Sequence, residues 1–230
     1  MNLSNKNHPI YEPEKWNKDV NIKTTHNCYS YALNLINPKM AEICKEYKKI
    51  KKNPDNLTCL KPQLGRYSGY IDEYINDKIY KKTFSKCRNI EARMKKDNPC
   101  IIKLKHGEEC PNHYYKIALY HAADGDDYHF YRQDNTGLWS HKDGETNATN
   151  KDRKGRIIRD PEASEQLRKG GRYRFCDFFA VPNSSKHKNM SSISRPYKDN
   201  ISGVQKIINE IKQHKKDKNK KDKNGGNLEI

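Results

Sequence analysis

Short apolar runs between turn-forming residues in the middle of the chain predict an antiparallel β-sheet. Strands are expected where aromatic and β-branched residues cluster between turn-forming residues. The final run is the most apolar; it is expected near the centre of the sheet and ends at Pro182. The expected strands are residues 100–104, 115–121, 128–132, 138–141 and 173–181.

Helical spacing dominates the segment before these strands. Apolar side chains in residues 28–36 recur three and four positions apart, which predicts a helix with one buried face. Thr25 or Asn27 can serve as its N-cap, so that Cys28 lies in the first turn. Residues 41–52 resume a helical pattern. Weaker helical patterns cover residues 69–97 and 161–168.

These patterns divide the chain into three parts. Residues 1–24 are expected to form an extended N-terminal arm, because prolines interrupt the segment and no periodicity holds, although Trp16 is expected to tuck into the domain. Residues 25–182 form a single α+β domain, with N-terminal helices packed on the sheet. Residues 183–230 are a basic, low-complexity tail, expected to be disordered except for a short amphipathic helix at 204–211.

The net charge indicates the class of partner that the chain binds. The 230 residues carry a formal charge of +17, with many lysines in the tail. Such a charge favours anionic partners, namely nucleic acid, anionic lipid or an acidic polymer. The sequence contains no helix-turn-helix, zinc-finger or RNA-binding strand motif, so any association with nucleic acid is expected to be non-specific.

Cysteine usage and the N-terminus bear on location. The seven cysteines include no C-x-x-C pair, and the first 16 residues lack the apolar core of a signal peptide. No window is apolar enough for a membrane span. We therefore expect an intracellular, reducing location, either cytoplasmic or virion-associated, with mostly free thiols. Cys110 and His113 form a C-x-x-H pair without a second pair, so neither a metal nor a cofactor is predicted.

Three residues have the chemistry of a thiol hydrolase. A cysteine at a helix N-terminus is favoured as thiolate, and the same backbone N–H groups can line an oxyanion hole, which makes Cys28 a candidate nucleophile. His129 and His141 lie on two strands joined by a tight loop. A hairpin centred near Asn135 places them almost opposite each other, so that one imidazole can orient the other.

The order of Asn27-Cys28-Tyr29, then His129, then His141 resembles the NlpC-type papain-like cysteine peptidases. In that superfamily the cysteine begins a helix packed on an antiparallel sheet, a strand carries the histidine, and the next strand carries a third polar group. The resemblance implies Cys28 as nucleophile, His129 as base and His141 as orienting group. It also implies a papain-like fold and a peptide, isopeptide or peptidoglycan-type amide substrate. Asn27, Tyr29 and Trp139 are expected to support the site.

Two alternatives to the hydrolase remain. The first is a basic protein that associates with nucleic acid and is packaged with it in a virion, which rests on the charge of +17. The second is a papain-like domain that acts as a scaffold without catalysis. A Cys28 sulfur far from both imidazoles would favour the scaffold.

Overall fold

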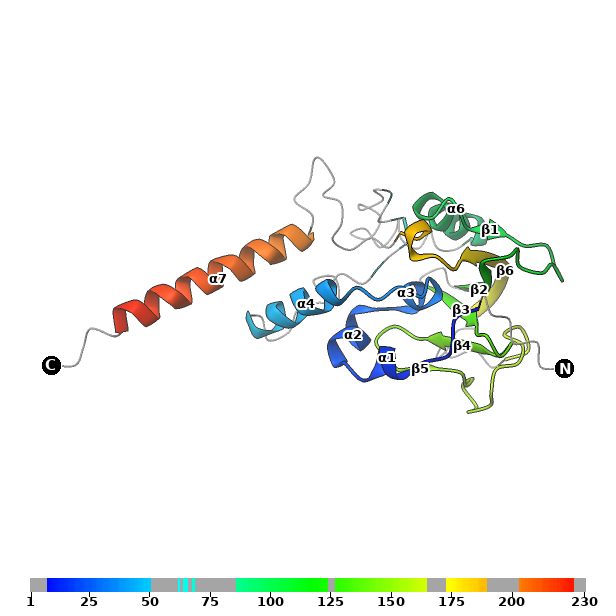
Figure 1. The fold of residues 1–230 in the computed structure, drawn as a ribbon, viewed down its shortest axis with the longest axis horizontal. Coiled ribbons are helices and arrows are strands. Elements are labelled where there is room, and N and C mark those ends of the chain that lie inside the picture. The colour runs from blue at the N-terminus through cyan, green and yellow to red at the C-terminus, as the bar shows by residue number, and fades with distance from the viewer. Residues whose placement is uncertain are drawn as a thin grey trace.

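A computed structural model of the protein describes residues 8–50, 62, 64, 65, 68, 86–123, 127–164, 173–189 and 203–225. The architecture is α+β, as the sequence predicts, with helices around one antiparallel sheet (Figure 1). The helices are α1 (Glu14–Asn17), α2 (Val20–Thr25), α3 (Cys28–Ala32), α4 (Pro38–Ile50), α6 (Cys87–Asp97), the 3₁₀ turn η2 (Ser185–His187) and α7 (Gly203–Gly225). The strands are β1 (Ile102–Lys103), β2 (Tyr114–Ala122), β3 (Tyr128–Gln133), β4 (Trp139–Lys142), β5 (Ala148–Thr149) and β6 (Tyr173–Pro182).

The six strands pair in the order β1-β6-β2-β3-β4-β5, and each neighbouring pair is antiparallel. All five predicted strands are present. β2 and β3 occupy the middle of the sheet, whereas β6 lies one place from its edge, so the expectation of a central β6 is wrong. The sequence did not indicate β5, because two residues are too few for a periodic pattern.

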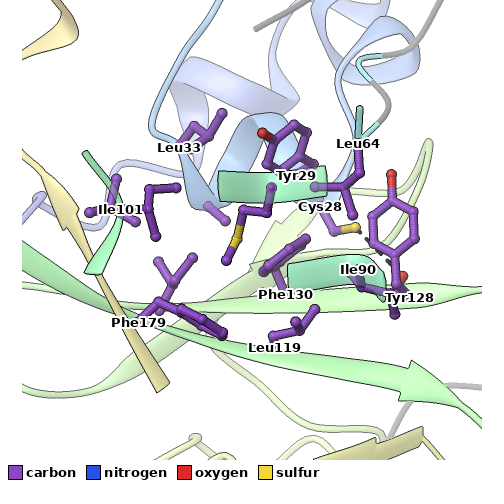
Figure 2. Packing of buried hydrophobic residues seen from close by; sticks show 14 of the residues in the cluster. Cys28, Tyr29, Leu33, Leu64, Ile90, Ile101, Leu119, Tyr128, Phe130 and Phe179 are labelled. Carbon is purple, nitrogen blue, oxygen red and sulfur yellow. Dashed lines mark hydrogen bonds between the residues drawn. The ribbon is translucent and has the colours of Figure 1, made fainter. Parts of the chain in front are cut away.

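Alternation of side chains along the strands divides the core into two layers. On one face of the sheet, Leu119 and Phe130 pack with residues of α3 and α6 (Figure 2). On the opposite face, Tyr120 and Tyr131 pack with Trp139 and with the loop that follows β5. Apolar side chains on both faces explain why the central strands carry aromatic residues at odd and even positions.

The N-terminal segment is helical rather than extended, so this expectation is wrong for the residues that form α1 and α2. Pro13 is the N-cap residue of α1, which begins at Glu14, and its φ of −60° suits a helix start. The side chain of Asp19 caps α2 by accepting a hydrogen bond of 2.7 Å from the Asn21 N–H. Trp16 is buried, as expected, and its ring lies 4.9 Å from that of Tyr31. These contacts hold the segment against the domain.

The tail contains a helix that is longer than predicted. The apolar positions of the segment 204–211 lie in α7, which has 23 residues. Ile208 and Ile211 pack with Tyr47 and other apolar residues of α4, and Tyr47 Oη donates a 3.1 Å hydrogen bond to Glu210. The predicted disorder is therefore not confirmed for residues 203–225, while residues 190–202 and 226–230 lie outside the described chain. Among the described helices, none is long and apolar enough to cross a membrane.

A disulfide joins Cys87, at the start of α6, to Cys176 in β6, across 89 positions of the sequence. Cys28, Cys100 and Cys110 are free thiols, which agrees with the expectation of mostly free thiols, whereas the disulfide itself was not predicted. Spacing along the sequence could not reveal it, because only the fold brings the two cysteines together. Cys59 and the turn at 124–126 lie outside the described residues, as does most of the expected helix at 69–97.

Candidate functional site

Cys28 is the first residue of α3, as the sequence predicts, and Asn27 is the N-cap. The Asn27 carboxamide oxygen accepts a hydrogen bond of 3.2 Å from the Ser30 N–H, and its Nδ2 donates to the Pro62 carbonyl at 2.7 Å. This capping ends the extended backbone that follows α2 and starts the helix at a defined residue. The role of Asn27 in the structure is thus to fix the position of the Cys28 backbone.

The Cys28 thiol lies in the hydrophobic core that α3 makes with the sheet (Figure 2). Only 6% of the residue is exposed, and Sγ lies 3.8 Å from the Tyr128 carbonyl oxygen, to which it donates. Burial raises the pKa of the thiol, and the carboxylates of Asp127 and Asp143 raise it further. The thiol is therefore protonated at neutral pH. The effect of burial outweighs that of the helix N-terminus, which a five-residue helix provides weakly.

His129 and His141 are in direct contact, as the sequence predicts. His129 Nε2 and His141 Nδ1 are 2.9 Å apart, and both rings are almost wholly buried. In the register of β3 and β4, His141 lies opposite Tyr131, so the two histidines are diagonal neighbours. The hairpin is thus centred at residue 136, one position later than expected.

The hydrogen bonds assign the protons of this histidine pair. His141 Nε2 lies 3.1 Å from the Lys151 carbonyl oxygen, which can only accept, so Nε2 carries a proton. Burial lowers the pKa of both imidazoles, which are therefore neutral. His141 Nδ1 then accepts from His129 Nε2–H, and the lone pair of His129 is on Nδ1. This hydrogen bond fixes the orientation of the two rings relative to each other.

Cys28 and the histidine pair are on different sides of β3. Tyr128 and Phe130, the neighbours of His129 in the strand, pack in the same cluster as Cys28. Alternation therefore directs His129 to the opposite face, where its ring lies 5.0 Å from that of Tyr131. No hydrogen bond joins Cys28 to His129 or His141 among the described residues. The structure thus brings two of the three predicted residues together and leaves the third across the sheet.

The two remaining predicted residues make core contacts. Tyr29 is fully buried beside Cys28, and its hydroxyl accepts a 2.6 Å hydrogen bond from Asn98. Trp139 packs on Phe178, with ring centroids 5.6 Å apart. Tyr29 therefore links α3 to the end of α6. Trp139 packs on the face of the sheet that carries the histidines.

A buried ionic network that the sequence did not predict lies between α3 and β3. The Arg132 guanidinium pairs with Asp134 at 3.0 Å, with both side chains 1% exposed. It also donates to Asn34 at 2.9 Å and lies 4.2 Å from the centre of the Tyr31 ring. The Tyr31 hydroxyl in turn lies 2.7 Å from Ser140 Oγ. An arginine that directly follows the aromatic run of a predicted strand was the available signal, since a buried charge requires partners.

Lys142 is a second buried cation that the sequence did not single out. Its ammonium donates hydrogen bonds of 2.6 Å to the carbonyl oxygens of Lys23, His26 and Gly144. Two of these carbonyls are at the C-terminal end of α2, where a positive charge is favourable. Lys142 thereby fixes the end of α2 and, one residue later, the entry to α3.

A dense run of exposed lysines lies on α7, which extends away from the sheet (Figure 1). Every residue from 212 to 220 is exposed, and this stretch contains five lysines and one aspartate. Lys215 pairs with Glu46 of α4 at 3.0 Å, so the base of the helix is held to the domain. The other lysines of the stretch are Lys212, Lys216, Lys218 and Lys220.

Comparison with known proteins gives one informative match. No protein-family model matches the chain, and no solved structure matches it. A curated relative, insoluble matrix shell protein 1 of Ruditapes philippinarum, is 32% identical over 157 residues, which cover 68% of this chain and 80% of the relative. Identity at this level over most of both chains indicates a shared fold and common descent. The chain therefore belongs to the same family as insoluble matrix shell protein 1.

Proposed function

We propose that the protein is a structural component of an insoluble matrix, to which it attaches by binding acidic polymers through helix α7. The observation that carries this proposal is an exposed lysine-rich helix in a relative of a shell matrix protein. Carboxylate- or sulfate-bearing polymers are the complementary partners, because their charge is repeated along a chain as the lysines are repeated along the helix.

The attachment of α7 to the domain supports this role. Ile208 and Ile211 pack against α4, and the pair Lys215–Glu46 lies near the start of the exposed stretch 212–220. The lysines of this stretch beyond Lys215 thus extend from the folded domain. A polymer that binds the helix would be held at a fixed site on the domain.

The disulfide supports a location different from the intracellular one that the sequence predicts. A bond between Cys87 and Cys176 is typical of proteins that mature in an oxidising environment. A relative that is named for a shell matrix points the same way. We therefore infer an oxidising location, where the disulfide persists.

Binding to polyaspartate and to a sulfated polysaccharide tests the proposal. The full chain should bind both at low salt, with an affinity that falls steeply as salt rises. The variant K212Q/K216Q/K218Q/K220Q should bind more weakly, with the slope of log K against log salt reduced by about 1 per lysine removed. The matched control replaces four exposed lysines of the domain, in K39Q/K105Q/K151Q/K186Q.

Two outcomes would contradict the proposal. Equal losses in the two variants would mean that overall charge, and not α7, determines binding. Much tighter binding to duplex DNA than to both acidic polymers would favour the nucleic-acid-associated protein that the charge of +17 also suggests.

A second candidate function is amide hydrolysis with Cys28 as nucleophile, His129 as base and His141 as orienting group. The proton assignment favours it, because His141 orients His129 and leaves the lone pair of His129 on Nδ1. The position of Cys28 across β3 favours instead a scaffold without catalysis. Hydrolysis would require the thiol to reach the histidine face of the sheet.

Alkylation with iodoacetamide distinguishes the hydrolase from the scaffold. A catalytic Cys28 should react faster at neutral pH than Cys100, which is exposed and free. Burial and the raised pKa of the Cys28 thiol predict the opposite order for a scaffold. Peptide mapping of the intact, disulfide-bonded protein gives both rates, and C28S identifies the signal of Cys28.

A further inference from the structure

Three potential metal ligands meet at one corner of the domain, away from the histidine pair. They are Cys87 at the start of α6, His121 in β2 and Cys176 in β6. One ligand atom from each residue lies within 4.8 Å of the other two, and all three residues are partly buried. Two sulfurs and an imidazole are ligands that Zn²⁺ and similar thiophilic cations prefer.

The local backbone explains why these residues converge. β2 and β6 pair Leu119 with Asp177 and Tyr120 with Phe175, so Cys176 is an extra residue in a β-bulge. A bulge redirects the side chain of the extra residue, and bulges are common beside functional sites. Here the bulge directs Cys176 toward the helix side of the sheet, where Cys87 begins α6.

Two further features suit a ligand site. His121 Nδ1 is buried and has no hydrogen-bond partner among the described residues, so its bonding capacity is unused. Cys87 is the first residue of an 11-residue helix whose N-cap, Lys86, makes no side-chain cap. Free N–H groups at that helix start favour a thiolate at Cys87 once the disulfide is open.

We propose that reduction of the Cys87–Cys176 disulfide creates a binding site for a thiophilic divalent cation, with His121 as third ligand. A low-molecular-weight thiol reductant supplies the two electrons: two reductant thiols form their own disulfide, and the protein disulfide becomes two thiols. On metal binding each protein thiol loses its proton to solvent, and neutral His121 donates a lone pair. Because the residues are partly exposed, water can take the fourth position.

The distances are compatible with this assembly. Tetrahedral zinc places sulfur and nitrogen ligands roughly 3.6–3.8 Å apart. The ligand atoms already lie within 4.8 Å of one another. Side-chain adjustments on the order of 1 Å therefore complete the site, and the disulfide and the metal are mutually exclusive occupants of the same sulfurs.

Zinc titration of the full-length chain tests the proposal. After reduction with a phosphine reductant, the protein should take one Zn²⁺ per chain from a chromophoric chelator, and Co²⁺ should give the absorption of a thiolate complex. The oxidised protein should take none. The variant H121N should bind at least about tenfold more weakly, as expected when a metal loses one of its protein ligands.

The matched control is H113N, which removes a histidine three residues from the free Cys110. His113 has a φ of 68°, a conformation that asparagine adopts readily, so this variant should fold. H113N should bind as the wild type does. Equal binding by H121N, or a preferential loss in H113N, would overturn the assignment.

Circular dichroism tests the proposal if the reduced chain unfolds. Zinc should then restore the native spectrum and raise the melting temperature of the reduced wild type, and it should do neither for reduced H121N. A reduced chain that is neither refolded nor bound by zinc would refute the proposal.

Discussion

Replacing Lys142 by methionine tests whether one buried ammonium holds the N-terminal helices on the sheet. Methionine has a similar length and no charge, so the change removes the three 2.6 Å hydrogen bonds to the carbonyls of Lys23, His26 and Gly144. A hydrogen bond from a charged donor contributes about 1.5–3 kcal/mol, which sums to about 5–9 kcal/mol for three. The ammonium no longer has to be desolvated, which offsets several kcal/mol of that loss. We therefore expect K142M to lower the free energy of unfolding by about 3 kcal/mol.

Urea denaturation followed by tryptophan fluorescence measures this change. Trp16 and Trp139 are 2% and 4% exposed, so both report on unfolding. Trp16 lies in the helical segment that Lys142 is inferred to hold. The control K151M changes an exposed lysine and should stay within about 0.5 kcal/mol of the wild type. A loss below about 1 kcal/mol in K142M, with an unchanged slope against urea, would refute the reasoning.

Two other predictions concern the buried polar groups. Burial lowers the pKa of His129 and His141, whereas unfolded histidines titrate at about 6.5. Below that pH the unfolded chain therefore binds more protons than the folded chain. The free energy of unfolding should then fall as the pH drops below about 6.5, by up to about 1.4 kcal/mol per pH unit for each histidine. Urea titrations at several pH values should give a smaller pH dependence for H141Q and an unchanged one for H106Q, and equal slopes in the two variants would contradict the assignment. Y31F removes the hydrogen bonds that the Tyr31 hydroxyl makes with Ser140 and Arg132, and should cost about 1–3 kcal/mol in the same assay. Y114F leaves the hydrogen bonds of Tyr31, Ser140 and Arg132 in place and should lower the free energy of unfolding by less than about 0.5 kcal/mol. Similar losses in both variants would count against the network.

Local patterns in the sequence were sufficient for the longer strands of the sheet and for the histidine pair. β2, β3, β4 and β6 were predictable because each is a run of aromatic and β-branched residues between turn-forming segments. The contact between His129 and His141 followed from a short loop, since a hairpin fixes which residues become neighbours. Asn27 was predictable as a cap because the chemistry of helix starts is local.

The environment of Cys28 could not be predicted in the same way. Its helix start suggested an ionised thiol, but the depth of burial depends on Phe130 and other residues about a hundred positions away. The side of the sheet that His129 faces follows from the side on which its neighbours Tyr128 and Phe130 are buried. The sequence does not fix that side, because both faces of the sheet carry aromatic residues. The docking of α7 on α4 and the disulfide are likewise contacts between distant segments. Periodicity carries no information about such partners.

The bond between Cys87 and Cys176 has a consequence for resistance to proteolysis. The loop that it closes contains β1 to β5, and joining residues 89 positions apart restricts the unfolded chain by about 4–5 kcal/mol. A single protease cut anywhere within that loop leaves the two fragments covalently connected, with β2 and β6 still paired. A single cut in this loop therefore releases neither fragment from the domain.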